Sequence, residues 1–354
     1  MTSATVQTFD SPRPAPRSGA AAAVERLTLT AFRCYESARI ETGGRSVVLT
    51  GANGAGKTNV LEAVSMLTPG RGLRRARLGD LARTVPGEAC RSNWAVAATV
   101  TGPRGETEIG TGVAAGDDKR TVHIDGRTVR GQAALGEHIG AQWLTPAMDR
   151  IFVEGRSGRR RFLDRLVYNI DPAHAGRITA YEHAMRERAR LLRDGGDAGW
   201  IGVLEETMAA KGTAVAAARR DLVARLNRYC HDADGPFPGA ALEARGAVEN
   251  WLAEGDALDA EDRLKTGLAA GRRHDGDTGG ARTGPHRSDL GVVHLPSGQA
   301  ADLCSTGEQK ALLVAIVIAA ARMAAAECGR LPGCCSTKSP RISMPPAATV
   351  CSTC

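Results

Sequence analysis

The chain has 354 residues, enough for one large or two medium domains with hydrophobic cores. Hydrophobic residues make up 42% of it, no run of eighteen apolar residues occurs, and no signal peptide is visible, so we expect a cytoplasmic protein without a membrane span. The net charge of +7, carried by 40 Arg and six Lys, permits nucleic-acid binding but does not establish it.

Residues 1–23 are rich in Pro, Ser, Ala and Thr, and we expect them to form a disordered leader. Residues 24–33 alternate apolar and polar side chains, which predicts a half-buried strand. A short apolar run at 47–49 then predicts a second strand, and residues 59–67 have the spacing of a helix.

Between that second strand and the helix lies a complete GxxxxGK[ST] motif, in the strand–loop–helix setting of a phosphate-binding loop. Its glycines allow backbone N–H groups to surround phosphates, and the helix N-terminus adds its positive dipole. The alternative is a glycine-rich turn that only introduces a core helix. The motif predicts binding of ATP by Gly51, Ala52, Asn53, Gly54, Ala55, Gly56, Lys57 and Thr58. Lys57 would contact the β- and γ-phosphates, and the Thr58 hydroxyl would ligate Mg²⁺.

The remaining pattern predicts two hairpins, then a long helical segment, then a second motif-bearing part. The hairpins cover 94–113, with a break near 103–105, and 120–130, with a turn at 125–126. Helices are predicted at 162–167, 178–192 and 203–229, a flexible return loop at 271–280, a strand at 290–295 and a buried helix at 311–326. This is the layout of an ABC-type P-loop ATPase head, an α/β fold with an antiparallel β layer and an inserted helical arm.

We therefore divide the chain into an N-terminal ATPase lobe (24–155), a helical arm or lid (156–270) and a C-terminal ATPase lobe (271–332). The C-terminal lobe contains a string similar to an ABC signature motif, formed by Ser305, Thr306, Gly307, Glu308 and Gln309. In such ATPases this helix N-terminus meets the γ-phosphate held by a partner's P-loop. The alternative is a plain helix cap, with Ser305 or Thr306 capping and Glu308 in the first turn.

Four strings together resemble the RecF family of SMC-related bacterial ATPases. They are Leu29–Tyr35, Asn53–Ala63 with Pro69–Arg74 downstream, Arg159–Asp164, and Thr283–Asp289. One departure is Ser288, where the family often carries a second Asp. The resemblance implies a slow cytoplasmic ATPase that forms an ATP-dependent homodimer and binds gapped DNA or single-strand/double-strand junctions. It further implies recombinase loading with other recombination mediator proteins, in gap repair and the SOS response.

Exposed arginines are the candidates for DNA contacts, because phosphate neutralisation requires cations. We select Arg71, Arg74, Arg75 and Arg77, with the helical arm as the second choice, and note a further arginine cluster at 156–165. His286 lies in a Gly-Pro turn, where a structural role is expected before a catalytic one.

A Walker B strand, an apolar run ending in Asp-Glu, should follow the signature helix near residue 333, but no Asp or Glu occurs after Glu327. Reading the codons of this segment in a shifted frame permits Leu-Leu-Leu-Asp-Glu-Val, so we hypothesise that residues 333–354 are frameshifted. The tail cysteines imitate a zinc site, but no matching ligand pair lies at a suitable spacing. We expect a gap in the sheet there. The competing functions are a transporter ATP-binding subunit and a nonfunctional truncated product.

Overall fold

The computed structural model describes residues 5–8, 23–84, 93–102, 105–231, 236–328, 333–336 and 349–352. The chain forms two compact units. Unit 1 comprises Met1–Met148 and Ala320–Cys354, and unit 2 comprises Asp149–Ala319.

Unit 1 contains a five-stranded, mostly parallel sheet in the order β1-β4-β14-β13-β9. The strands are β1 (Thr5–Thr8), β4 (Val47–Thr50), β14 (Thr349–Ser352), β13 (Gly333–Ser336) and β9 (Ala141–Leu144). Only β1 runs antiparallel, on the outer edge of β4, so part of the expected leader is a strand. The apolar side chains of β4 and β9 are buried, as expected for strands of a parallel sheet.

The backbone at Gly333–Ser336 pairs in parallel with β9 on one side and with β14 on the other. Our expectation of a gap in the sheet is therefore wrong for these four residues, because backbone hydrogen bonding does not require the apolar side chains that we had looked for. Residues 337–348 lie outside the described part of the chain, and so do the side chains of the tail cysteines.

A six-stranded antiparallel sheet forms the second layer of unit 1, in the order β3-β2-β5-β6-β7-β8. Its strands are β3 (Tyr35–Glu41), β2 (Ala23–Phe32), β5 (Trp94–Gly102), β6 (Gly105–Val113), β7 (Thr121–Ile124) and β8 (Arg127–Val129). Both predicted hairpins are confirmed. In the second, Asp125 and Gly126 have φ values of 48° and 75°, the left-handed pair of a tight hairpin turn.

Helix α1 (Lys57–Met66) contacts β2 and β5 of the antiparallel sheet and β14 of the parallel sheet, so it lies between the two layers. Its apolar side chains join the hydrophobic core of unit 1. In this core the rings of Phe32 and Trp94 pack edge to face, with their centroids 5.6 Å apart. Two short 3₁₀ helices, η1 (Leu78–Leu81) and η2 (Gln132–Glu137), complete the unit. Because α1 is packed on both sides, the loop that precedes it has a fixed support.

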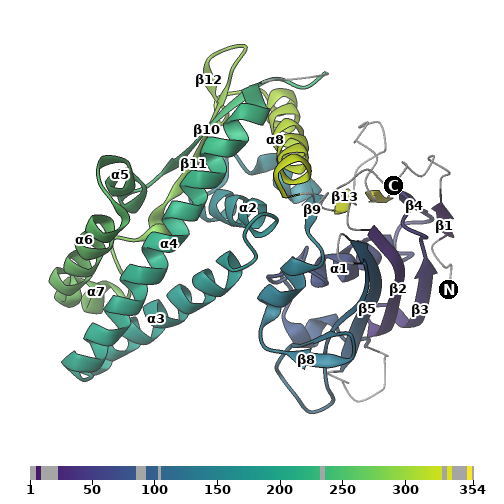
Figure 1. Ribbon diagram of the computed structural model, residues 1–354, viewed down its shortest axis with the longest axis horizontal. Coiled ribbons are helices and arrows are strands. Elements are labelled where there is room, and N and C mark those ends of the chain that lie inside the picture. Colours follow the sequence, from purple (N-terminus) through teal and green to yellow (C-terminus); the bar gives the residue numbers. More distant parts are fainter. Residues whose placement is uncertain are drawn as a thin grey trace. The chain divides into compact units, whose positions relative to one another are not determined.

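Unit 2 is mostly helical and also contains a small antiparallel sheet, in the order β10-β11-β12 (Figure 1). Its helices are α2 (Arg156–Tyr168), α3 (His174–Asp194), α4 (Ala198–His231), α5 (Ala247–Glu254), α6 (Ala257–Ala270) and α7 (Arg272–Thr278). Its strands are β10 (Ala240–Arg245), β11 (Asp289–His294) and β12 (Gln299–Ala300), and η4 covers Pro285–Arg287. A further 3₁₀ helix, η3 (Pro146–Arg150), spans the boundary between the units.

The predicted arm helices are confirmed as α2, α3 and α4. Gly195 ends α3 in the left-handed conformation, with φ of 70°, and α3 packs along α4. The prediction of a flexible loop at 271–280 is wrong, because residues 272–278 form α7. The glycines and charges suggested a loop, but Asp275 is buried against Arg188 of α3 and holds the segment as a helix turn.

Helix α8 (Thr306–Cys328) confirms the predicted buried helix near 311–326. Its buried side chains include Leu312, Leu313, Ile316 and Met323. By length and composition, residues 306–327 are also the one candidate membrane span in the described part of the chain. However, 61% of the most apolar 18-residue stretch of this helix is buried within the protein. Burial of this extent is what a core helix shows.

Candidate nucleotide-binding site

The P-loop connects the end of β4 to the start of α1 in a conformation that depends on its glycines. Gly54 and Gly56 have φ values of 85° and 95°, a region that other residues adopt only at a cost. At Gly56 a Cβ atom would also lie 2.6 Å from the Tyr35 hydroxyl oxygen, so even a methyl group has no space. Residues 51–54 are exposed, and their backbone is therefore accessible to a ligand.

The N-terminus of α1 provides donors for an anion. Its cap residue, Gly56, makes no side-chain hydrogen bond, and the first turn contains no acidic residue. The first N–H groups of a helix have no partner within the helix and require one from outside. This helix end can therefore receive phosphate oxygens.

Lys57 begins α1 and folds back over the loop. Its Nζ donates to the Gly51 carbonyl oxygen at 2.6 Å and to the Ala52 carbonyl oxygen at 3.0 Å, and the residue is only 7% exposed. An ammonium group has three N–H donors, so the two loop carbonyls position it and leave one direction for a phosphate oxygen. Thr58 follows in the first turn, partly buried, with a hydroxyl oxygen of the kind that Mg²⁺ accepts.

A buried ion pair fixes α1 to the turn after β2. The Arg33 guanidinium donates to both Glu62 carboxylate oxygens at 2.8 Å and to the Asp80 carbonyl oxygen at 2.7 Å. Glu62 is 1% exposed, and a carboxylate at such a position requires cations. Our sequence reasoning missed this pair, although an acid within the apolar stretch Val60–Met66 of α1 was a usable signal.

The predicted DNA contacts Arg71, Arg74, Arg75 and Arg77 are all exposed. Arg74 also lies against the P-loop helix, where its Nη1 donates to Asn59 Oδ1 at 3.1 Å and to Glu62 Oε2 at 3.4 Å. Part of its role is therefore to compensate the charge of the buried Glu62.

The signature string in unit 2 forms a capping box at the start of α8. The Glu308 carboxylate accepts hydrogen bonds from the Ser305 N–H at 2.8 Å and from the Ser305 hydroxyl at 2.7 Å, while the Glu308 N–H donates to Ser305 Oγ. These bonds to Ser305 lower the pKa of the Glu308 carboxyl. Ser305, Thr306 and Gly307 are exposed, so the helix start is accessible.

Two further side chains hold this helix start in place. Gln309 is buried, and its Nε2 donates to the Cys304 carbonyl oxygen at 2.8 Å. Lys310 lies 3.4 Å from the Asp149 carboxylate. Both of the alternatives that we weighed for the string remain compatible with this geometry, because a capped helix start can still receive an anion.

The two remaining family strings, 159–164 and 283–289, interlock within unit 2. Arg159 donates to both carboxylate oxygens of Asp289, at 2.7 and 2.9 Å, and Arg160 donates to the Ser288 carbonyl oxygen at 2.8 Å. Sequence reasoning did not predict that these strings meet, because 130 residues separate Arg159 from Asp289.

A buried arginine completes this junction. Arg219 of α4 donates to both Asp164 oxygens, at 2.8 and 2.9 Å, and to the Pro285 carbonyl oxygen at 2.7 Å. Burial alone would raise the pKa of Asp164, but the charge of Arg219 and hydrogen bonds from His174 and Arg219 lower it to about 2. Arg159, Asp164, Pro285 and Asp289 therefore serve the architecture of unit 2.

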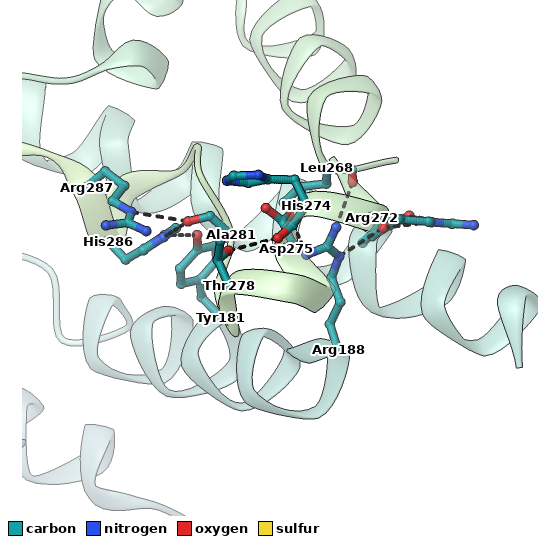
Figure 2. Close-up of polar contacts among 11 residues, drawn as sticks. Tyr181, Arg188, Leu268, Arg272, His274, Asp275, Thr278, Ala281, His286 and Arg287 are labelled. Atoms are coloured by element: carbon teal, nitrogen blue, oxygen red, sulfur yellow. Dashed lines mark hydrogen bonds and ion pairs between the residues drawn. The ribbon is translucent and has the colours of Figure 1, made fainter. Parts of the chain in front are cut away.

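His286 occupies a structural position, as expected for a histidine in a Gly-Pro turn. Its Nδ1 is 2.6 Å from the Tyr181 hydroxyl, and its Nε2 is 2.9 Å from the Ala281 carbonyl oxygen (Figure 2). The carbonyl can only accept, so Nε2 carries a proton and Nδ1 accepts from Tyr181 in the neutral ring. Burial lowers the pKa of His286, which favours this neutral form.

Comparison with known proteins is consistent with this architecture. The model of the RecF/RecN/SMC N terminal domain matches residues 23–328. A DNA replication and repair protein RecF from Caulobacter vibrioides is 48% identical over 319 residues, covering 87% of this chain and 82% of that protein. The protein of the same name from Mesorhizobium japonicum is 47% identical over 316 residues, with the same coverage.

One similar solved structure is that of the recombination mediator protein RecF-ATPrS in the RecFOR pathway. It superposes on this chain with a TM-score of 0.79 and is 17% identical in sequence. It covers 94% of this chain and 93% of that one, and this likeness shows a shared fold. The ABC-type P-loop ATPase head with an antiparallel layer and a helical arm, expected from the sequence, is thereby confirmed. The chain belongs to the RecF family of proteins with a RecF/RecN/SMC N-terminal domain.

Proposed function

We propose that this protein is an ATP-dependent DNA-binding protein of replication and recombinational repair. The observation that carries the proposal is the P-loop, in which an uncapped helix N-terminus and the Lys57 ammonium converge on exposed glycine backbone. The names of the relatives, which are DNA replication and repair proteins, support the same role. The proposal includes a cytoplasmic location.

Within this role, ATP is the ligand of Gly51–Thr58, and Mg²⁺ would be held by Thr58 together with the nucleotide phosphates. A bound Mg²⁺ supplies charge neutralisation at the β- and γ-phosphates. The chain itself supplies the positioning, because Lys57 is held by two loop carbonyls and α1 is fixed through Glu62. The neutral Thr58 hydroxyl suits a hard cation that keeps several of its water ligands.

The exposed start of α8 supports ATP-dependent homodimerisation. Ser305–Gln309 of one copy would face the triphosphate held by the P-loop of a second copy, so that ATP is enclosed between two heads. The capping box keeps the helix start ordered before the partner arrives, which reduces the entropy lost on association. We propose that the dimer binds gapped DNA and single-strand/double-strand junctions, and that it acts with other recombination mediator proteins in recombinase loading and the SOS response.

Hydrolysis of ATP requires groups that this sequence lacks. Strand β13 ends at Ser336, where the Walker B acids of such ATPases would follow, and no Asp or Glu occurs after Glu327. We propose that the chain retains nucleotide but hydrolyses essentially none, and that a frameshift from about residue 333 removed the acids. This deficit is also the observation that favours the second candidate, a nonfunctional product. A gene sequence with no alternative frame encoding Asp-Glu at this place would end the frameshift hypothesis.

The experiment that tests the proposed function measures ATP binding by isothermal titration calorimetry in the presence of Mg²⁺. In Lys57→Ala the cationic contact to the phosphates is lost, and we expect no measurable binding. The exposed Lys119 provides the matched control, since Lys119→Ala changes the net charge equally and should bind like the unaltered chain. Equal ATP affinity in Lys57→Ala and Lys119→Ala would refute the assignment.

A further inference from the structure

The start of α2 carries an unusual density of positive charge. Residues 150–161 contain five Arg (150, 156, 159, 160 and 161) and one acid, Glu154. These arginines differ in their contacts, and Arg159 has a structural role. The Arg159 side chain is 15% exposed and is held by both Asp289 oxygens and by the Glu154 carbonyl oxygen at 2.6 Å, so it stabilises the fold.

Four other arginines lie on α2 and on the η4 turn that α2 contacts, and we call Arg156, Arg160, Arg161 and Arg287 the arginine cluster. The Arg160 Nη1 bond to the Ser288 carbonyl oxygen places α2 directly against the turn that carries Arg287. Arg156 lies one helical turn before Arg160, with its Nε 3.7 Å from Asp289 Oδ2 and 70% of its side chain exposed.

Arg161 and Arg287 are exposed like Arg156, whereas Arg160 is half-buried. The Arg161 Nη2 atom lies 3.9 Å from the Cβ position of Gly158, so the side chain leans back over the first turn of α2. Arg287 uses its Nε to donate to the Ala281 carbonyl oxygen at 3.1 Å. Because this bond uses one N–H of the guanidinium, the outer face of Arg287 can contact a ligand.

The protein compensates this charge only in part. Asp289 already serves Arg159 in a two-bond pair, and Asp164 is buried under Arg219. Among the described residues, none offers a carboxylate within ion-pair distance of Arg161. The first turn of α2 also has no acidic residue and no side-chain cap, although a helix N-terminus favours anions.

Like charges spaced four residues apart on a helix, at its positive end, work against the stability of the protein itself. Burial and the neighbouring charges of Arg219 and Arg161 lower the pKa of Arg160, which shows the same crowding. Arrangements that break these rules of stability are expected at functional or strained sites.

We propose that the arginine cluster binds the phosphate backbone of a nucleic acid. Guanidinium groups match phosphate oxygens with paired donors, and four of them along one helix and one turn fit successive phosphates better than a single small anion. Residues 153–161 include no Trp, Tyr or Phe for base stacking, so the contact positions the nucleic acid without reading its sequence. This inference rests on the proposed DNA-binding function and assigns it a surface in unit 2, separate from Arg71–Arg77 in unit 1.

The test is fluorescence anisotropy of a labelled gapped DNA duplex with the full chain, in a salt series between about 50 and 200 mM. The double variant Arg161→Gln/Arg287→Gln should bind about tenfold more weakly, and its log–log salt slope should fall by about two, since each phosphate contact contributes about 0.9. Arg127→Gln/Arg130→Gln is the matched control, because both residues are exposed on the antiparallel layer and the charge change is equal. It should retain affinity and slope.

Two further measurements distinguish loss of DNA contacts from structural damage. The variant Arg161→Lys/Arg287→Lys retains the charge and should retain the salt slope, which a merely structural defect would not produce. Thermal unfolding of each variant should match that of the unaltered chain. The proposal is overturned if the Gln variant binds DNA with unchanged affinity and slope, as it would if the cluster served an acidic protein segment. If the unaltered chain itself shows no salt-dependent DNA binding, the proposed function is wrong and this inference falls with it.

Discussion

Arg188 of α3 is the residue whose removal should most damage unit 2. It is 1% exposed and donates to the Glu205 carboxylate at 2.9 Å, to the Asp275 carboxylate at 2.8 Å and to the Leu268 carbonyl oxygen at 2.7 Å (Figure 2). These three bonds connect α3 to α4, α6 and α7. In Arg188→Met the apolar volume is largely kept, but the two acids lose their common cation.

The substitution affects Glu205 and Asp275 differently, and this difference determines how much stability is lost. Glu205 keeps a second guanidinium, because Arg272 Nε lies 3.0 Å from its Oε1. Asp275 is 2% exposed, and its Oδ1 has no hydrogen-bond partner among the described residues even before the substitution. Removing one partner of a buried ion pair costs about 3–5 kcal/mol. Because one acid of the two remains paired, we expect about 3 kcal/mol, a large part of a typical stability of about 5–15 kcal/mol.

Urea denaturation followed by circular dichroism measures this change as a lower unfolding midpoint. Arg190→Met is the control, because Arg190 pairs with Glu187 at 3.2 Å on the exposed side of the same helix, where a pair contributes about 0–1 kcal/mol. Arg188→Met/Asp275→Asn should recover part of the loss, since the unpaired buried charge is gone. A loss below about 1 kcal/mol in Arg188→Met would refute the reasoning, because it would mean that water reaches these acids.

Four further outcomes follow from the described contacts. The pKa of Asp164 is lowered from 3.8 to about 2, so its contribution to stability is complete above pH 4 and is lost as the pH falls towards 2. The Asp164→Asn variant should therefore show a smaller loss of stability with acid over that range, measured by urea titration at each pH. Ser305→Ala removes the capping box and should cost about 1 kcal/mol in the same assay. DNA affinity of the unaltered chain should fall steeply with salt, and a flat dependence would exclude an electrostatic surface. Phosphate release from ATP should be at background for this chain and should rise, with DNA stimulation, in a version with the reading frame restored from residue 333; normal turnover by the chain as it stands would contradict the missing-acid argument.

Local patterns were sufficient to predict the P-loop, both hairpins and the arm helices. A P-loop is a contiguous string whose glycines are required by backbone conformation, as at Gly56, and two short strands joined by an Asp-Gly turn are equally local. The capping box could likewise be predicted locally, because Ser305 and Glu308 are only three residues apart in the sequence.

Features that depend on distant partners could not be predicted in this way. Helix α7 contains Gly and Asp residues that indicate a loop, and it is helical because Asp275 meets Arg188, 87 residues away in the chain. Strand β13 contains no apolar run, yet its backbone pairs with neighbours on both sides. The interlock of 159–164 with 283–289 is of the same kind, since neither string shows by itself which part of the chain it contacts.

The order of strands in the parallel sheet has a consequence for synthesis on the ribosome. Strand β4, which precedes the P-loop, is hydrogen-bonded to β14, and β13 and β14 come from residues beyond 332, whereas unit 2 is one continuous segment. Unit 2 can therefore fold while the chain is still being made, but the parallel sheet is incomplete until β13 and β14 have been synthesised. During that interval the edge of β4 that later pairs with β14 is unpaired, and an unpaired strand edge can pair with another chain. We therefore expect the sheet that contains β4 to be completed only after residues 333–352 have been synthesised.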